Sequence, residues 1–106
     1  MTRSKYKNIK TEIDGITFDS KKEAKHYCDL KILLRQGLIT DLTLQPKFKY
    51  NDDNGKLAFT YIADFQFYDV IDKKWRVQDV KGVLTPIYKL KKKLIEPRHN
   101  IEIEEI

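Results

Sequence analysis

Ionisable residues interrupt two segments that otherwise predict buried strands. Asp64 lies inside the aromatic and aliphatic run Tyr61–Phe67. On the next predicted strand, Asp79 and Lys81 share a face with Val77, because side chains alternate along a strand. An ionised group on a buried strand is costly unless it is paired or binds a metal. Two carboxylates can hold a divalent cation that polarises a phosphate, and a lysine can orient or deprotonate the attacking water, so these residues suit phosphodiester hydrolysis.

A third carboxylate, that of Glu23, lies in the first turn of a predicted helix and can project toward the same strands. The N-terminus of that helix also favours an anion nearby. Each acidic residue has a purely structural alternative. Glu23 matches a capping box with Ser20. Asp79 with Lys81 matches an ion pair at a solvated strand end, and Asp64 matches an aspartate whose oxygens accept main-chain hydrogen bonds.

The elements that must position these residues follow from turn and capping signals. Asp14-Gly15 is a tight-turn dipeptide and predicts a hairpin within Lys5–Phe18. A capping box, apolar residues at helical spacing and a closing glycine predict a helix over Ser20–Gln36. Three strands then form a meander, with Pro46 marking an edge or a bulge in the first. These strands are predicted over Leu38–Tyr50, Leu57–Val70 and Trp75–Val80.

A second helix and a short strand complete the chain. Thr85 as N-cap and Pro86 in the first turn open the helix, and Pro97 is expected to stop it. The last strand covers Ile101–Ile106, where apolar and acidic residues alternate. After the hairpin the order is therefore αβββαβ, which predicts an α/β (α+β) fold in a single domain over residues 1–106.

The composition is that of one folded domain with a basic surface. The 106 residues are 41% hydrophobic and 35% charged, and 21 Lys and Arg against 16 Asp and Glu leave a net charge of +5. A polyanionic partner is therefore expected, and charge alone does not choose between nucleic acid and a membrane surface. The sequence shows neither a membrane-spanning stretch nor a signal segment, and its single cysteine allows no intrachain disulfide, so we expect a cytoplasmic protein.

Asp64 followed by Asp79-Val80-Lys81, with a helical Glu23 before them, resembles the signature of the PD-(D/E)XK nuclease superfamily, whose core also has the order αβββαβ. Several segments together resemble a family of small phage-encoded proteins similar to phage-type endonuclease I, which resolves Holliday junctions. These segments are residues 18–24, 44–46, 61–65, 79–82 and 88–91. The resemblance extends from residue 5 to residue 106, and it departs from the name of the motif in having Ala63 rather than proline before Asp64.

The resemblance implies a restriction-endonuclease-like fold with a mixed central sheet and the activity of a metal-dependent DNA endonuclease. Asp64, Asp79 and the main-chain carbonyl of Val80 would hold Mg²⁺ or Mn²⁺, with Glu23 as a further ligand. Lys81 would position the attacking water, and cleavage would leave a 5′ phosphate. The substrate would be branched DNA such as a Holliday junction, and cutting both strands would need a homodimer. A phage or prophage origin would place the protein in a bacterial cytoplasm.

Basic residues outside this group are the expected DNA contacts. Tyr88, Lys89 and Lys92 on the second helix would line one side of the site and contact phosphates. Lys5 and Lys7, on the basic arm before the hairpin, would track a DNA backbone. An ordinary solvated helix face and a merely flexible basic arm are the corresponding structural alternatives.

Two other functions are compatible with the same residues. One is a module that keeps the nuclease fold and binds DNA without cutting it, and the other is a nuclease that acts on linear duplex. The intact pair Asp64 and Asp79, together with Lys81, favours an enzyme. A binding module would bind DNA independently of either aspartate, whereas a nuclease would lose strand scission when either is replaced.

Overall fold

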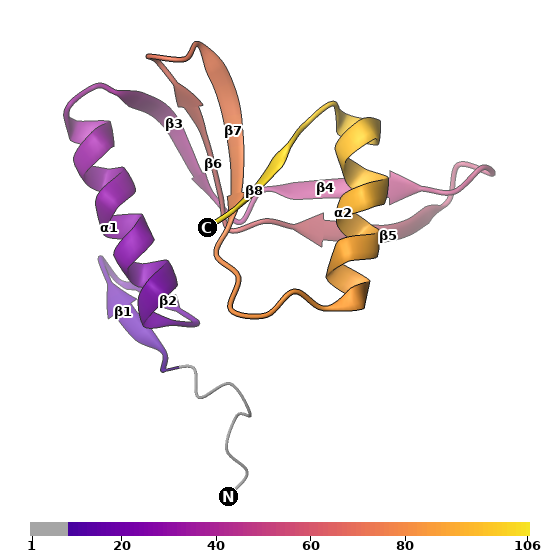
Figure 1. Ribbon diagram of the computed structural model, residues 1–106, viewed down its shortest axis with the longest axis horizontal. Coiled ribbons are helices and arrows are strands. Elements are labelled where there is room, and N and C mark those ends of the chain that lie inside the picture. Colours follow the sequence, from indigo (N-terminus) through magenta and orange to yellow (C-terminus); the bar gives the residue numbers. More distant parts are fainter. Residues whose placement is uncertain (1–8) are drawn as a thin grey trace, which may run out of the picture.

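The computed structural model describes residues 9–106, which form two helices and eight strands (Figure 1). The N-terminal hairpin, the first helix and the last strand lie where the sequence predicts them. The element bounds are β1 Thr11–Ile13, β2 Ile16–Phe18, α1 Lys21–Arg35, β3 Ile39–Leu44, β4 Lys47–Asn51, β5 Leu57–Ile62, β6 Phe65–Asp69, β7 Lys74–Asp79, α2 Pro86–His99 and β8 Ile103–Glu105.

The predicted turn and caps are confirmed. β1 pairs antiparallel with β2 across Asp14-Gly15, and both turn residues have positive φ, which such a tight turn requires. At the start of α1 the Oγ of Ser20 accepts the N–H of Glu23 at 3.1 Å. This bond satisfies one of the N–H groups that a helix N-terminus leaves free, and it holds Glu23 in the first turn.

The first two strands of the predicted meander are each interrupted in the middle. Pro46, predicted to mark an edge or a bulge, lies at the interruption of the first strand, whereas the prediction of one continuous strand over Leu57–Val70 is wrong. Gln45 has φ of 53°, in the left-handed region, and Pro46 has no N–H, so β3 cannot continue directly into β4. The opposing chain breaks at Ala63 and Asp64, between β5 and β6. Two main-chain bonds join the breaks, from Gln45 N to Asp64 O (3.0 Å) and from Ala63 N to Pro46 O (3.1 Å). The bend therefore takes Asp64 out of the strand interior.

Beyond the bend, the two halves of this long hairpin enter different sheets. β3 and β6 join a four-stranded sheet in the order β3-β6-β7-β8, whereas β4 and β5 form a separate two-stranded ribbon. In the larger sheet β8 runs parallel to β7 and the other neighbours are antiparallel, so the sheet is mixed. If β3 with β4, and β5 with β6, are each counted as one strand, the order after the N-terminal hairpin is αβββαβ. The predicted α/β (α+β) fold class is confirmed.

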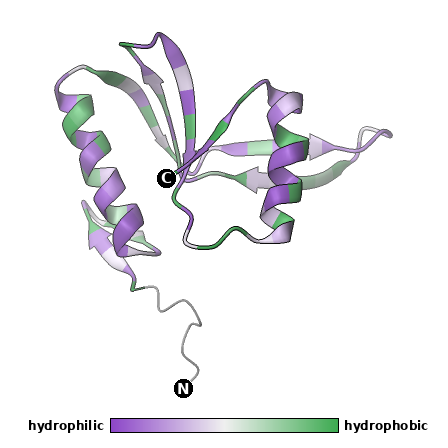
Figure 2. Ribbon diagram, viewed as in Figure 1, coloured by the Kyte–Doolittle hydropathy of each residue, from purple (hydrophilic) through white to green (hydrophobic). Residues whose placement is uncertain are grey.

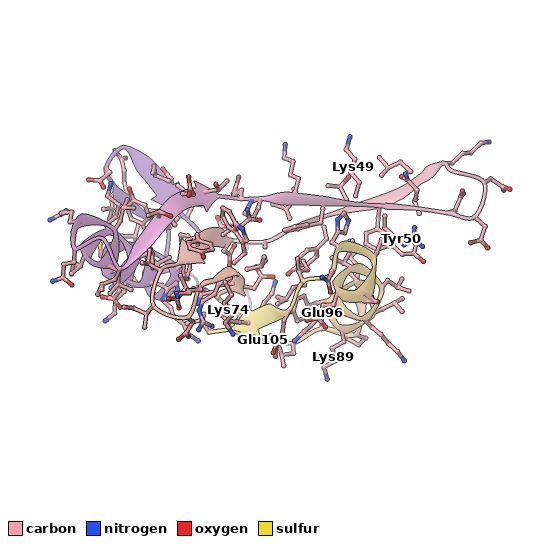
Figure 3. The ribbon with its side chains drawn as sticks, turned by 90° about the horizontal axis from the view of Figure 1, so that it is seen from above. Lys49, Tyr50, Lys74, Lys89, Glu96 and Glu105 are labelled. Atoms are coloured by element: carbon pink, nitrogen blue, oxygen red, sulfur yellow. The ribbon has the colours of Figure 1, made fainter. Side chains whose placement is uncertain are left out.

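The two helices pack on opposite faces of the mixed sheet. Phe65 and Phe67 of β6 lie in one buried cluster with α1, and Val77 of β7 lies in another with Ile95 of α2. Figure 2 shows green and purple positions on both helices, as expected where one face of a helix is buried and the other meets solvent. Figure 3 shows α2 lying beneath the β4–β5 ribbon, with Tyr50 directed toward the helix and Lys49 away from it.

The second helix runs past its predicted end. Thr85 caps it as expected, through its Oγ1 and the N–H of Tyr88 at 3.1 Å, but Pro97 lies inside the helix. The last turn survives because β4 holds it: His99 Nε2 lies 2.7 Å from the carbonyl oxygen of Lys49, and Arg98 donates to that of Asn51. Proline removes one helical hydrogen bond, and these tertiary contacts offset that loss. Within residues 9–106 neither helix is long and apolar enough to span a membrane.

Candidate active site

Two carboxylates meet at the bend. The N–H of Val80 donates to Asp64 Oδ2 at 2.8 Å, and the N–H of Asp64 donates to Asp79 Oδ1 at 3.0 Å. Asp64 N also lies 3.2 Å from the carbonyl oxygen of Gln78, which joins the bend to β7. The structural alternative for Asp64 was an aspartate whose oxygens accept main-chain hydrogen bonds. One of its oxygens, Oδ2, does accept such a bond. The same bonds hold the two aspartates beside each other, at the end of β7 and the start of β6.

Asp79 is almost completely enclosed. The residue is 1% exposed, and its Oδ2 has no hydrogen-bond partner among the described residues. The ammonium of Lys81 is the nearby cation, with Nζ 3.6 Å from that oxygen. Burial raises the pKa of Asp79 to about 6, although Lys81 acts in the opposite direction. The attraction of Lys81 therefore does not fully offset the cost of burying the ionised Asp79 side chain.

The third predicted carboxylate faces the same space from α1. Glu23, Asp64, Val80 and Lys81 line one cavity of about 320 Å³, together with Asp19, Ser20, Lys22 and Gly82. Burial, and then the negative charge of Asp64, raise the pKa of Glu23 to about 7. Burial also raises the pKa of Asp64, against the effect of the Val80 N–H. Three of the four residues predicted to do chemistry, Glu23, Asp64 and Lys81, therefore line one cavity. Asp79 does not line it, but contacts two of them, through the N–H of Asp64 and the ammonium of Lys81.

A second cavity adjoins the first on the side of the N-terminal hairpin. It has a volume of about 220 Å³, and Glu23 and Asp64 line both cavities. Its other walls come from the end of β3 and from β2, and they include Gln45 and Phe18. We name the two cavities together the acidic cleft. Gln45 thus adds a polar side chain to the cleft from the same bend that positions Asp64.

The donor set of the acidic cleft is compatible with a divalent cation. Within residues 9–106, no three His, Cys, Asp or Glu side chains form a group that could hold a metal by themselves. The predicted set differs from such a group, because it joins Asp64 and Asp79 to a main-chain carbonyl and leaves further positions to water, as Mg²⁺ sites commonly do. Asp79 Oδ2 has no hydrogen-bond partner among the described residues, and burial raises the pKa values of Asp79 and Glu23, so the ionised forms of both carboxylates are poorly solvated. A divalent cation would stabilise those ionised forms.

Comparison with known families covers nearly the whole chain. A family model described as "Protein of unknown function (DUF1064)" matches residues 3–104. The chain belongs to the DUF1064 family. In the same comparisons, no curated protein and no solved structure matches this DUF1064 protein.

The predicted DNA contacts of this DUF1064 protein lie apart from one another. Tyr88 is only 7% exposed, and its ring lies under the Lys81 ammonium, with Nζ 4.3 Å from the ring centre. Lys92 pairs with Glu105 at 3.4 Å. Lys89 is exposed and points away from the β4–β5 ribbon, on the far side of α2 in Figure 3. Of the predicted contacts on the basic arm, Lys5 and Lys7 lie outside the described residues.

Sequence reasoning missed a polar wall of the cleft. Lys22 lines the cavity and its Nζ lies 3.5 Å from the carbonyl oxygen of Lys81, so it links α1 to the end of the lysine-bearing segment. The sequence feature that could have indicated Lys22 is its position next to Glu23 in the first helical turn.

His26 makes a long-range contact that sequence reasoning also missed. It lies one turn after Glu23 and is half-buried, with Nε2 2.6 Å from Gln78 Oε1. No local pattern indicated that contact, because 52 positions separate the partners.

Proposed function

We propose that this DUF1064 protein is a metal-dependent DNA endonuclease. The observation that carries the proposal is the pair of main-chain bonds that fix the two carboxylates, from Asp64 N–H to Asp79 Oδ1 and from Val80 N–H to Asp64 Oδ2. Lys81 Nζ lies 3.6 Å from Asp79 Oδ2, and Glu23 and Asp64 line the same cleft. Burying carboxylates together is unfavourable unless a cation compensates for their charge. A fold that pairs them at a strand end, in an open cavity, is therefore suited to metal-assisted chemistry.

Asp64 and Asp79, the main-chain carbonyl of Val80 and Glu23 would hold Mg²⁺ or Mn²⁺. When bound, the ion would polarise the phosphate and lower the pKa of a water molecule. The protein's own lysines supply the other charges. Lys81 is held between Asp79 and the face of Tyr88, a geometry that presents its ammonium to the attacking water and to the phosphate oxygens. Lys22 adds a second ammonium to the lining of the cleft, 3.5 Å from the carbonyl oxygen of Lys81.

The proposed reaction is hydrolysis. A water oxygen bonds to phosphorus, the bond from phosphorus to the 3′ oxygen breaks, and that oxygen leaves with a proton. The products are a 5′ phosphate and a 3′ hydroxyl. The main-chain bonds to Asp64 and Asp79 fix both carboxylates before substrate arrives, so that little reorganisation is needed during the reaction.

We further propose branched DNA, such as a Holliday junction, as the substrate, and a homodimer as the working form. The resemblance to phage-type endonuclease I supports the first. The second follows from the number of sites, because one chain offers one acidic cleft and paired cuts in two strands need two. Light scattering with and without a four-way junction tests the dimer, and a strictly monomeric complex would rule it out.

A second candidate function is DNA binding without cleavage. One observation favours it: within residues 9–106 no group of three metal-ligating side chains stands together. A module of this kind would keep its salt-sensitive affinity for DNA when the aspartates are replaced. The buried carboxylate of Asp79 favours the enzyme instead, because its Oδ2 has no hydrogen-bond partner among the described residues and the Lys81 ammonium, 3.6 Å away, offsets its charge only in part.

Cleavage of an end-labelled four-way junction and of a matched linear duplex, in Mg²⁺, Mn²⁺ and EDTA, separates these possibilities. Asp64→Ala is the test variant, and Asp53→Ala, which removes an exposed carboxylate at the tip of the β4–β5 ribbon, is the control. We expect metal-dependent, junction-selective cutting that Asp64→Ala abolishes and Asp53→Ala retains. Equal cutting of both DNAs would keep the nuclease and remove the junction preference. Binding without any cutting would favour the binding module.

A further inference from the structure

A groove adjoins the acidic cleft at Lys81. It has a volume of about 290 Å³ and lies between β5 and the first turns of α2, and Lys81 lines both it and the cleft. Its lining residues are Thr60, Tyr61, Ile62, Lys81, Thr85, Ile87, Tyr88 and Lys91. We call it the α2 groove. Because Lys81 belongs to both, a chain-like ligand that leaves the cleft past Lys81 enters the α2 groove directly.

The acidic cleft and the α2 groove differ in the sign of the net charge that lines them. Three carboxylates, those of Asp19, Glu23 and Asp64, line the larger cavity of the cleft, whereas no acidic residue lines the α2 groove and its two ionisable lysines are Lys81 and Lys91. The first turn of α2 also has no acidic residue, so the positive end of the helix dipole adds to the lysine charges. The α2 groove is therefore suited to an anion in its own right, without a metal.

Lys91 is the residue of α2 that gives this groove its charge. Its ammonium lies 5.6 Å from the centre of the Phe59 ring, which holds the side chain on the flank of the helix that faces β5. Lys92 is engaged on the other flank by Glu105. Lys89 points away from the ribbon in Figure 3. Among the basic residues of α2, Lys91 is thus the one that lines the groove continuing from the cleft.

The walls of the groove suit a sugar–phosphate chain. Ile62 and Ile87 are large apolar residues that remain 49% and 65% exposed, and they lie beside the two lysines. Apolar side chains can cover the faces of deoxyribose rings, while lysines neutralise the phosphates between them. Thr60 and Thr85 add hydroxyl groups of the kind that contact phosphate oxygens.

We propose that the α2 groove binds the sugar–phosphate backbone of the DNA strand next to the phosphodiester held in the cleft, with Lys91 as a phosphate contact. The inference rests on the proposed function, and it specifies the direction in which the substrate leaves the site. With this inference, the proposed main DNA contact of α2 is Lys91 instead of Lys89, which the sequence had indicated.

The test is the salt dependence of binding, measured by fluorescence anisotropy with a labelled four-way junction in EDTA, where no cleavage occurs. The proteins compared are the wild type, Lys91→Ala, Lys91→Arg and, as the matched control, Lys93→Ala, which removes an exposed lysine outside the groove. Each phosphate contact contributes about −0.9 to the slope of log K against log salt concentration, so losing one makes the slope less steep and weakens binding on the order of tenfold at roughly 50 mM salt. We expect that loss for Lys91→Ala, retention of the wild-type slope by Lys91→Arg, and a much smaller change for Lys93→Ala.

The two proposals fail in different ways. Equal slopes for wild type and Lys91→Ala, with circular dichroism confirming that both are folded, would overturn the groove assignment even if the wild type cuts DNA. Equal losses in Lys91→Ala and Lys93→Ala would overturn it as well, because they would indicate a diffuse charge effect. A wild type that never cuts, but whose binding slope depends on Lys91, would overturn the nuclease and leave the groove in place.

Discussion

Replacing Asp79 with asparagine should stabilise the metal-free protein at alkaline pH. Asparagine has the shape of the protonated carboxyl group and carries no charge. Asp79 is 1% exposed and its Oδ2 has no hydrogen-bond partner among the described residues, so the ionised side chain is poorly accommodated. The substitution removes that charge and also loses the attraction of Lys81, whose Nζ lies 3.6 Å away.

The size of the effect follows from the pKa. Burial raises the pKa of Asp79 from its ordinary 3.8 to about 6, against the attraction of Lys81. Because the pKa is higher in the folded protein than in the unfolded chain, the stability linked to this group is present below about pH 4 and is lost as the pH rises through about 6. The ionised form is therefore disfavoured by roughly 3 kcal/mol at pH 8. Burying the asparagine NH₂ without an acceptor costs about 1 kcal/mol at every pH.

Urea unfolding in EDTA, followed by circular dichroism from pH 4 to pH 8, measures the difference directly. Asp79→Asn should be about 1 kcal/mol less stable than the wild type at pH 4 and about 2 kcal/mol more stable at pH 8. Asp53→Asn, which changes an exposed carboxylate in the ribbon turn, should show no such reversal. A difference between Asp79→Asn and the wild type that stays constant across this range would refute the claim that ionisation of Asp79 is unfavourable in the folded protein.

Three further outcomes are expected. At pH 8, Mg²⁺ at about ten times its dissociation constant should stabilise the wild type by roughly 1.4 kcal/mol and leave Asp79→Asn unchanged in thermal melts, and an equal shift in both would count against Asp79 as a ligand. Ser20→Ala, which removes the cap of α1, should lower the free energy of unfolding by about 1 kcal/mol, as urea titration will show. Arg76→Met removes the ion pairs of Arg76 with three carboxylates. One partner is Asp69, whose pKa is lowered first by the Asp72 N–H and then by the guanidinium, so the resulting loss in urea midpoint should be larger at pH 7 than at pH 3.

The sequence by itself determined the local structure of this protein. Asp14-Gly15 sets the first hairpin, and Ser20 and Thr85 set the starts of the two helices, because a turn or a cap depends on residues within three or four positions of each other. Residue type also marked Asp64 and Asp79 as unusual on apolar strands, which is a signal that needs no coordinates.

Tertiary structure alone decided how those residues meet. The break at Ala63 and Asp64 depends on Gln45 and Pro46 across the hairpin, so the sequence indicated one strand over Leu57–Val70 where the folded chain has β5 and β6. The helix continues past Pro97 because β4 holds its last turn. That Lys91 rather than Lys89 lines the α2 groove depends on which flank of the helix faces β5. Each of these outcomes joins segments that are distant along the chain, and no local propensity encodes such contacts.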